Sequence, residues 1–189
     1  MHIKPWKILI DLDGVLSNFT RTACEIWDKP NPYADGKGRG VYDVPMLLGI
    51  EAVKFWEPYG NADVWAGQHK TEEADMLVNL CKSAVGVENV CILSAPNLNE
   101  ESLVGKIRWV KKHYPEFKRQ YLFGPRKHFC AAENHILIDD YDLNVDNFIE
   151  AGGKAILFPR PWNRNHVLNI DPVEYVTQEL HKLQIMVGF

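Results

Sequence analysis

Four acidic residues follow two short apolar runs that lie far apart in the chain. Asp11 and Asp13 end the first run, and Asp139 and Asp140 come directly after a later one. Carboxylates brought together repel each other and raise one another's pKa unless a cation neutralises them. Oxygen ligands of this kind suit Mg²⁺, which binds a few carboxylates together with waters and a substrate phosphate. The four aspartates therefore predict a magnesium site, provided that the fold brings them together.

The spacing of Asp11 and Asp13 gives this pair more than metal binding to do. Side chains at positions i and i+2 of an extended segment share one face, so one carboxylate can attack or ligate while the other transfers a proton. Ser94 ends another apolar run and adds a hydroxyl. The plain alternatives are that the acids only cap turns or helices and that Ser94 is an ordinary strand-end hydroxyl.

Five short apolar runs predict the strands that would position these side chains. They cover residues 7–12, 90–94, 120–123, 135–138 and 154–158. Such runs are typical of strands buried on both faces of a parallel sheet. Helical patterns alternate with them, which predicts an α/β fold with a Rossmann-like parallel sheet of about five strands. Ligands of such sheets bind beyond the carboxyl ends of the strands. Three of the predicted strands end in the polar residues described above, namely the two aspartate pairs and Ser94.

The helices between these runs have recognisable starts. The predicted first residues or caps are Thr71, Asn99, Asp142 or Asn144, and Asp171. In the helix after Asn99, the apolar pattern places Leu103, Ile107 and Val110 toward the core. Lys106 belongs to the same helix, and the pattern leaves open whether it lies on a solvated basic face.

Residues 20–70 interrupt the alternation of strands and helices. The stretch is aromatic and is rich in Gly, Pro and Asp around residues 30–40. A structureless loop of that length would be unusual inside a compact domain. We therefore expect a small, mostly helical cap inserted after the first strand, and a core formed by residues 1–19 and 71–189. A loop of rigid and basic residues, Pro-Arg-Pro-Trp-Asn-Arg, follows the last apolar run.

Composition and charge exclude several classes of protein. Of the 189 residues, 46% are hydrophobic and 24% charged, which is ordinary globular usage and unlike a disordered or fibrous chain. No apolar stretch approaches the ~18 residues that span a membrane. The N-terminal residues lack the apolar region of a secretory signal, so we expect a cytoplasmic protein. The net charge of −4 argues against nucleic acid as a partner, and four cysteines without a CxxC pair argue against a zinc site.

The motifs resemble those of the haloacid dehalogenase superfamily. Asp11-Leu-Asp13-Gly14-Val15-Leu16 is similar to its first motif, DxDGxL/T. Ser94 after an apolar strand resembles the second motif, and the pair Asp139-Asp140 resembles the fourth. A basic third motif is expected between them, and Lys127 or Lys106 could supply it. The motifs occur in the expected order and extend from residue 8 to about residue 160.

A closer resemblance is to the 5′(3′)-deoxyribonucleotidase branch, which includes the cytosolic type C pyrimidine nucleotidases. Residues 11–19 resemble its DxDGVLADF, residues 94–96 its (T/C)SP, residues 105–110 its EKxxWV helix, and residues 126–127 part of its RDK. The chain departs from the pattern at Ala95, at Leu93 where Thr or Cys often precedes the serine, and in a longer loop after Lys127. These departures bear on the substrate more than on the reaction.

The resemblance implies a Mg²⁺-dependent phosphohydrolase that acts on (deoxy)nucleoside monophosphates through an aspartyl-phosphate. Asp11 would be the nucleophile and Asp13 the general acid and base. Asp11, the backbone carbonyl of Asp13, Asp139 and Asp140 would hold the metal.

The resemblance also implies which residues bind the substrate. Ser94 and Lys127 would hold the phosphoryl oxygens, with Lys106 as runner-up or partner. Among the cap aromatics, Phe19 is the first candidate for stacking on a base, followed by Tyr42 and Trp65.

Other interpretations stay open at this point. Both lysines could be surface residues, and the aromatics could simply form the core of the cap. The same chemistry could serve another small phosphoester, such as a sugar phosphate or a nucleic-acid 3′-phosphate end. A non-enzymatic phospho-accepting switch is a further alternative, although its acid pair normally precedes a single phosphorylated aspartate. Relatives of this branch are often dimers, which leaves a homodimer open.

Overall fold

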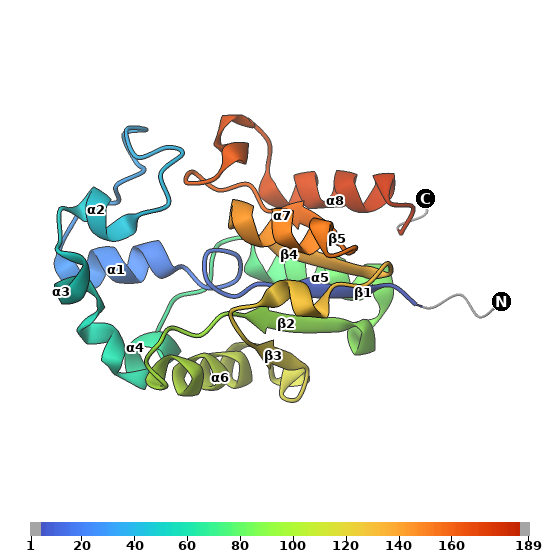
Figure 1. Ribbon diagram of the computed structural model, residues 1–189, viewed down its shortest axis with the longest axis horizontal. Helices are drawn as coiled ribbons and strands as arrows, with labels where there is room; N and C mark the ends of the chain where they lie inside the picture. The colour runs from blue at the N-terminus through green and yellow to red at the C-terminus, as the bar shows by residue number, and fades with distance from the viewer. Residues whose placement is uncertain (1–4, 186–189) are drawn as a thin grey trace.

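A parallel sheet of five strands forms the centre of the molecule in the computed structural model, which describes residues 5–185 (Figure 1). The strands are β1 (Lys7–Ile10), β2 (Val90–Ser94), β3 (Tyr121–Phe123), β4 (His135–Asp139) and β5 (Lys154–Leu157). Their order across the sheet is β3-β2-β1-β4-β5, and every pairing is parallel. The predicted Rossmann-like sheet is therefore confirmed, with β1 in its middle.

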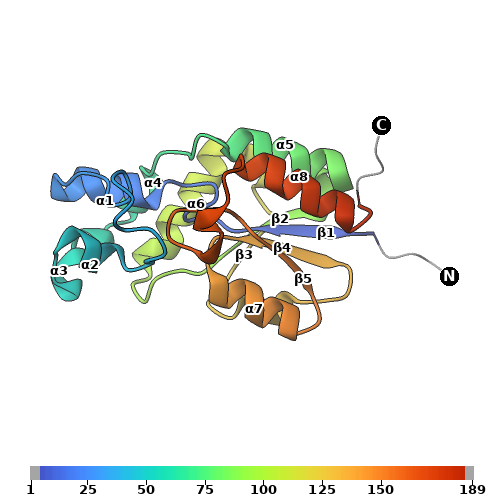
Figure 2. The same cartoon turned by 90° about the horizontal axis from the view of Figure 1, so that it is seen from above.

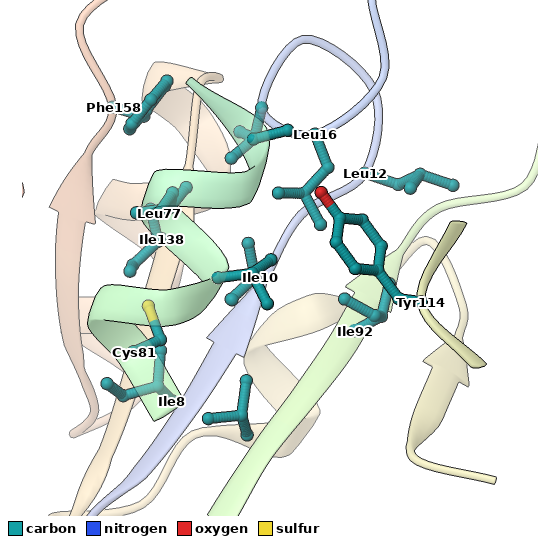
Figure 3. Packing of buried hydrophobic residues seen from close by; sticks show 14 of the residues in the cluster. Ile8, Ile10, Leu12, Leu16, Leu77, Cys81, Ile92, Tyr114, Ile138 and Phe158 are labelled. Atoms are coloured by element: carbon teal, nitrogen blue, oxygen red, sulfur yellow. The ribbon is translucent and has the colours of Figure 1, made fainter. Parts of the chain in front are cut away.

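Alternating side chains of β1 divide the core into two layers. Ile8 and Ile10 pack with buried residues of α5 (Ala74–Val85), α6 (Glu101–His113) and α8 (Pro172–Lys182). Leu9 packs on the opposite face with Phe148 of α7 (Asp142–Glu150). Figure 2 shows α5 and α8 on one side of the sheet and α7 on the other, and Figure 3 shows the larger layer from close by. Both faces of the sheet are thus covered, as its apolar strands require.

One predicted helix cap has a different role in the structure. Asp171 caps α8 as predicted, since its Oδ1 accepts from the backbone N–H groups of Val173 and Glu174 at 2.9 Å. Helix α5 has no side-chain cap, because the hydroxyl of Thr71 donates to the carbonyl of Val15 over 2.7 Å instead. The prediction for Thr71 was wrong because a partner 56 residues away in sequence competes for the hydroxyl.

Helix α6 turns a different face inward than its apolar pattern predicts. Leu103 and Ile107 are only half-buried. At Gly105, an added Cβ would lie 2.4 Å from the carbonyl oxygen of Ala62 in α4 (Ala62–Ala66), so glycine lets the two helices approach closely. Because α4 covers this side of the helix, the fully buried positions of α6 are Ser102, Gly105, Lys106, Trp109 and Val110.

An insertion with four short helices separates β1 from α5. The helices are α1 (Phe19–Trp27), α2 (Val44–Leu48), α3 (Ala52–Trp56) and α4. They share a small apolar core of their own, and Figure 1 shows them beyond the end at which β1 leaves the sheet. The chain enters and leaves the insertion side by side, because Ser17 pairs with Lys70 and the N–H of Asn18 donates to the carbonyl of His69 over 2.7 Å. The limits of a cap at residues 20 and 70 stay a prediction.

Short 3-10 turns join the remaining segments. They are η1 (Pro58–Gly60), η2 (Val87–Asn89), η3 (Pro115–Phe117), η4 (Lys127–Cys130) and η5 (Arg164–Val167). Within residues 5–185, none of the helices is both long enough and apolar enough to cross a membrane.

Candidate active site

The carboxyl ends of three neighbouring strands bring the polar residues singled out in the sequence to one edge of the sheet. Asp11 follows β1, and its N–H still donates to the carbonyl of Ile138 in β4 over 2.9 Å. Ser94 ends β2 and Asp139 ends β4. Because β1 lies between β2 and β4, these side chains meet although the sequence separates them widely.

Asp11, Asp139 and Asp140 form a buried acid triad. One oxygen of each lies within 4.8 Å of the others, and all three side chains are almost inaccessible. Lys127, also buried, places its Nζ 2.7 Å from Asp11 Oδ1 and 2.6 Å from Asp139 Oδ2. A carboxylate oxygen can accept more than one partner, so Asp11 can pair with Lys127 and still take a further ligand.

Asp13 stands apart from the acid triad. Its carboxylate pairs with Lys106 and accepts a hydrogen bond from Ser17 Oγ over 3.2 Å. The side chain is 27% exposed, unlike those of the acid triad. The structure therefore brings together three of the four predicted carboxylates, and a metal contact through the backbone carbonyl of Asp13 stays a prediction.

Burial dominates the electrostatics of the acid triad. It raises the pKa of Asp11 to about 7, with Lys127 opposing the shift and the charges of Asp139 and Asp13 adding to it. Burial also raises the pKa of Asp140 well above its ordinary value, and the charges of Asp11 and Asp139 raise it further. For Lys127, burial disfavours the charged form, but the two adjacent carboxylates outweigh it and raise the pKa. Three acids against one ammonium leave the acid triad short of positive charge, which a divalent cation would supply.

Lys106 is the centre of a second buried polar group. Its Nζ lies 3.1 Å from Ser94 Oγ and donates to the carbonyl of Ala95 and the carboxylate of Asp13. The ammonium also lies 5.1 Å from the ring centroid of Trp65 in α4. Lys106 is 2% exposed and Lys127 is 3% exposed. The alternative that these two are solvated surface lysines is therefore wrong.

The turn after β1 requires glycine at position 14. The φ angle of Gly14 is +78°, a region that L side chains rarely adopt. An added Cβ would lie 2.2 Å from Asp140 Oδ2 and 3.0 Å from the ring of Trp162. The backbone of this turn thus contacts the acid triad directly.

A cavity of about 550 Å³ lies between these polar groups and the insertion. Its polar lining includes Asp13, Lys106 and Asp140. The described residues that line it do not include Asp11, Ser94, Lys127 or Asp139. The aromatic residues along its walls are Phe19, Tyr42, Trp56, Trp65 and Trp162. The three aromatics predicted to bind a base all line the cavity.

These aromatics also pack on other rings. The ring of Phe19 stacks on that of Tyr59 with centroids 5.2 Å apart, and Tyr42 contacts Tyr141 with centroids 4.4 Å apart. Lining the cavity and forming the core of the insertion are therefore compatible roles.

The loop after β5 contributes residues that the sequence did not single out. Trp162 donates its indole Nε1–H to Asp140 Oδ2 over 2.7 Å. Arg160 Nε donates to the carbonyl of Gly14 over 2.6 Å. Asn144, expected only as a helix start, donates to both oxygens of Asp139 at 3.2 Å. The loop was visible as a rigid, basic stretch, but no sequence pattern indicates which carboxylate such a loop reaches.

Comparison with known proteins identifies a family. A protein-family model described as "5′ nucleotidase, deoxy (Pyrimidine), cytosolic type C protein" matches residues 61–181. The matched stretch contains Ser94, Lys106, Lys127, Asp139 and Asp140, and it begins after the first acid pair. No curated protein matches the chain.

Solved structures share the fold at low sequence identity. A haloacid dehalogenase family hydrolase from Deinococcus radiodurans R1, with bound phosphate and sodium, has a TM-score of 0.59 and 16% identity, covering 98% of this chain and 99% of that chain. Protein Tyrosine Kinase A of Mycobacterium tuberculosis has a TM-score of 0.58 and 15% identity over 93% and 98% of the two chains. A haloacid dehalogenase-like hydrolase from Streptococcus pneumoniae has a TM-score of 0.51 and 13% identity over 93% and 98%. These similarities show the shared fold, not a shared substrate.

Proposed function

The chain belongs to the family of the deoxy (pyrimidine) 5′ nucleotidases of cytosolic type C, and we propose that it hydrolyses (deoxy)nucleoside monophosphates with Mg²⁺ as cofactor. Membership of this family makes it a phosphatase that acts on a phosphoester. One observation carries the finer proposal: Asp140 of the buried acid triad and Lys106, which contacts Ser94, both line an aromatic cavity of about 550 Å³.

Asp11 is the proposed nucleophile. Its carboxylate attacks phosphorus, a new O–P bond forms, and the bond from phosphorus to the nucleoside oxygen breaks. Asp13 gives a proton to the leaving alkoxide and then takes one from the water that hydrolyses the aspartyl-phosphate. That water releases phosphate and restores the carboxylate of Asp11. Lys127, 2.7 Å from Asp11, favours the ionised form that attack requires.

Lys106 and Ser94 are the proposed phosphate-binding pair. Lys106 lines the cavity and lies 3.1 Å from Ser94 Oγ, whereas Lys127 lies between two carboxylates. This arrangement favours Lys106 over Lys127 as the lysine that holds the phosphoryl oxygens, the reverse of the order expected from the sequence. A phosphate at Lys106 would compete with Asp13 for the ammonium.

The acid triad fits a magnesium ion by its donor chemistry. It offers three converging carboxylate oxygens within 4.8 Å of one another. Lys127 contacts both Asp11 and Asp139, but Asp139 also accepts from the N–H of Tyr141 over 2.9 Å and from Asn144 at 3.2 Å. Asp11 and Asp140 are therefore the main proposed ligands, and Asp139 supports them. When bound, the ion would neutralise the carboxylates and orient a phosphate oxygen.

The aromatic walls support a nucleoside as the leaving group. Phe19, Tyr42, Trp56 and Trp65 all line the cavity, and all four belong to the segment between β1 and α5. Flat apolar rings of this kind stack on nucleobases, because every base has a π-face. A sugar phosphate would leave much of this apolar surface without a partner, which favours a nucleotide over that alternative.

Phosphate release from a panel of substrates tests the proposal. The panel contains nucleoside and deoxynucleoside monophosphates together with ribose 5-phosphate, each with Mg²⁺ and with EDTA. We expect release from the nucleotides with Mg²⁺, little release with EDTA, and none by Asp11→Asn. No turnover of any nucleotide, or full turnover by Asp11→Asn, would overturn it. Turnover of ribose 5-phosphate alone would favour the sugar-phosphate alternative, and a phosphoprotein that persists without turnover would favour the switch.

A further inference from the structure

Trp162 joins the acid triad to the wall of the cavity, and it belongs to neither the acid motifs nor the insertion. We propose that Trp162 is a positioning residue: its indole N–H fixes Asp140 for a divalent cation, while its ring forms part of the cavity wall. The inference rests on the proposed function, because it assigns a role toward the proposed magnesium site.

The hydrogen bond to Asp140 is the first observation. Trp162 Nε1 lies 2.7 Å from Asp140 Oδ2, and the carboxylate is 3% exposed. An indole N–H only donates, so it holds the carboxylate in one orientation and stabilises its ionised form. Outer partners that orient a ligand in this way contribute to metal affinity although they never touch the metal.

The loop that carries Trp162 is itself anchored to the site. Asn163 is 1% exposed, and its Nδ2 donates to the carbonyl of Asp140 over 2.9 Å and to that of Phe158 over 2.8 Å. Arg160 donates to the carbonyl of Gly14 and pairs with Glu73 at 3.0 Å. The indole is therefore delivered to Asp140 by a loop that cannot move away without breaking several buried contacts.

The ring of Trp162 is enclosed from two further sides. Gly14 lies against one side of the ring, since a Cβ added to it would lie 3.0 Å from Trp162 Cζ2. On another side, the ring of Tyr33 contacts the indole with centroids 5.2 Å apart. The N–H of Gly40 in the insertion donates to the carbonyl of Pro161 over 2.8 Å. Figure 1 shows the loop between β5 and α8 reaching toward this part of the insertion. A ring that only filled space here would not need its N–H aimed at a carboxylate.

Magnesium binding to the metal-free protein tests the inference without using turnover. Calorimetric titration with MgCl₂ compares wild type, Trp162→Phe and Trp56→Phe. Trp162→Phe keeps a ring and removes the N–H, and Trp56→Phe makes the same change on another wall of the cavity. We expect Trp162→Phe to raise the magnesium Kd about tenfold or more and Trp56→Phe to leave it unchanged.

Measuring kcat and KM separately distinguishes a role of Trp162 in positioning Asp140 from a role in packing the cavity wall. At saturating Mg²⁺, Trp162→Phe should recover most of its kcat and keep a KM for nucleotide near that of wild type. An unchanged magnesium Kd in folded Trp162→Phe would overturn the inference and leave the proposed function standing. A wild-type protein that binds no Mg²⁺ would overturn the proposed site as well, so the two failures are distinguishable.

A measurement on the wild-type protein covers the case in which Trp162→Phe does not fold. The chain has six tryptophans, whose indole N–H groups give separate signals in a ¹H–¹⁵N NMR spectrum. Without substrate, addition of MgCl₂ should shift the signal of Trp162, assigned with Trp162→His or Trp162→Tyr. The absence of any indole shift at saturating Mg²⁺ would contradict the proposal.

Discussion

Lys127 lies 2.7 Å from Asp11 and 2.6 Å from Asp139, in a place that water does not reach. Removing one partner of such a buried cluster leaves charges without compensation, which typically costs about 3–5 kcal/mol. We expect Lys127→Met to lower the free energy of unfolding by about that amount, measured by urea denaturation without Mg²⁺.

Lys106→Met provides the matched control for Lys127→Met. Its partner Asp13 is 27% exposed and can be rehydrated, so the loss of stability should be clearly smaller. The loss of activity should nevertheless be large, because Lys106 is the proposed phosphate-binding lysine. Equal stability losses for the two variants would contradict the assignment of Lys127 as the structural partner of the acid triad.

The raised pKa of Asp11 predicts how magnesium binding depends on pH. Burial raises this pKa to about 7 from an ordinary value of 3.8. In the folded, metal-free protein, Asp11 is therefore protonated at pH values below about 7 at which it would ordinarily be ionised. Metal binding must release that proton. Raising the pH from about 6 to about 8 should therefore tighten the magnesium Kd about tenfold through Asp11, and the raised pKa of Asp140 acts in the same direction. Calorimetry at constant ionic strength measures this, and an equal Kd at both pH values would contradict it.

At the scale of elements, the contact between α4 and α6 sets the position of Lys106. A Cβ at Gly105 would lie 2.4 Å from Ala62 O and from Trp65 Cβ, which is far closer than atoms tolerate. We expect Gly105→Ala to cost about 1–3 kcal/mol of stability, as overpacking usually does. It should also reduce kcat/KM, because Lys106 is the next residue. Chemical denaturation and phosphate release measure the two effects.

Gly124→Ala is the control for this contact. A Cβ on Gly124 meets nothing within 4 Å, so its stability and activity should stay close to those of wild type. If Gly105→Ala behaved like Gly124→Ala, the close approach of α4 would not be what positions Lys106.

The polar residues at the strand ends could be predicted from the sequence. The residues that form hydrogen bonds to them or to the turn beside them could not. Asp11, Ser94 and Asp139 were predictable because apolar strand runs and the geometry of parallel sheets place their ends together. Thr71 and Trp162 were not, since their hydrogen-bond partners are 56 and 22 residues away and depend on how loops pack. The burial of Lys106 was also hidden, because helical periodicity treats lysine as outward-facing and ignores the approach of α4.

At the scale of the whole molecule, the residues proposed for the chemistry and those proposed for substrate selection come from different parts of the chain. The acid triad, Lys127 and the Lys106–Ser94 pair come from the sheet and its helices, while four of the five cavity aromatics come from residues 19–65. The net charge of −4 does not describe the site, where four carboxylates lie beside two lysines.

This division predicts a selective effect of Phe19→Leu. The substitution removes a ring from the cavity wall, so the KM for a nucleoside monophosphate should rise by about fivefold to tenfold, as for a lost base-stacking contact of about 1 kcal/mol. The KM for a small phosphoester without a base should change little. Steady-state kinetics on both substrates measures the ratio, and an equal change in the two KM values would contradict a base-binding role.

The most direct test of the account is to trap the covalent intermediate. Enzyme turning over a deoxynucleoside monophosphate with Mg²⁺ is quenched in acid, digested, and its peptides are examined by mass spectrometry. The account predicts a phosphorylated peptide in which Asp11 carries the phosphoryl group, and no such peptide from Asp11→Asn. Turnover with no phosphorylated Asp11, or with the phosphoryl group on another residue, would contradict it.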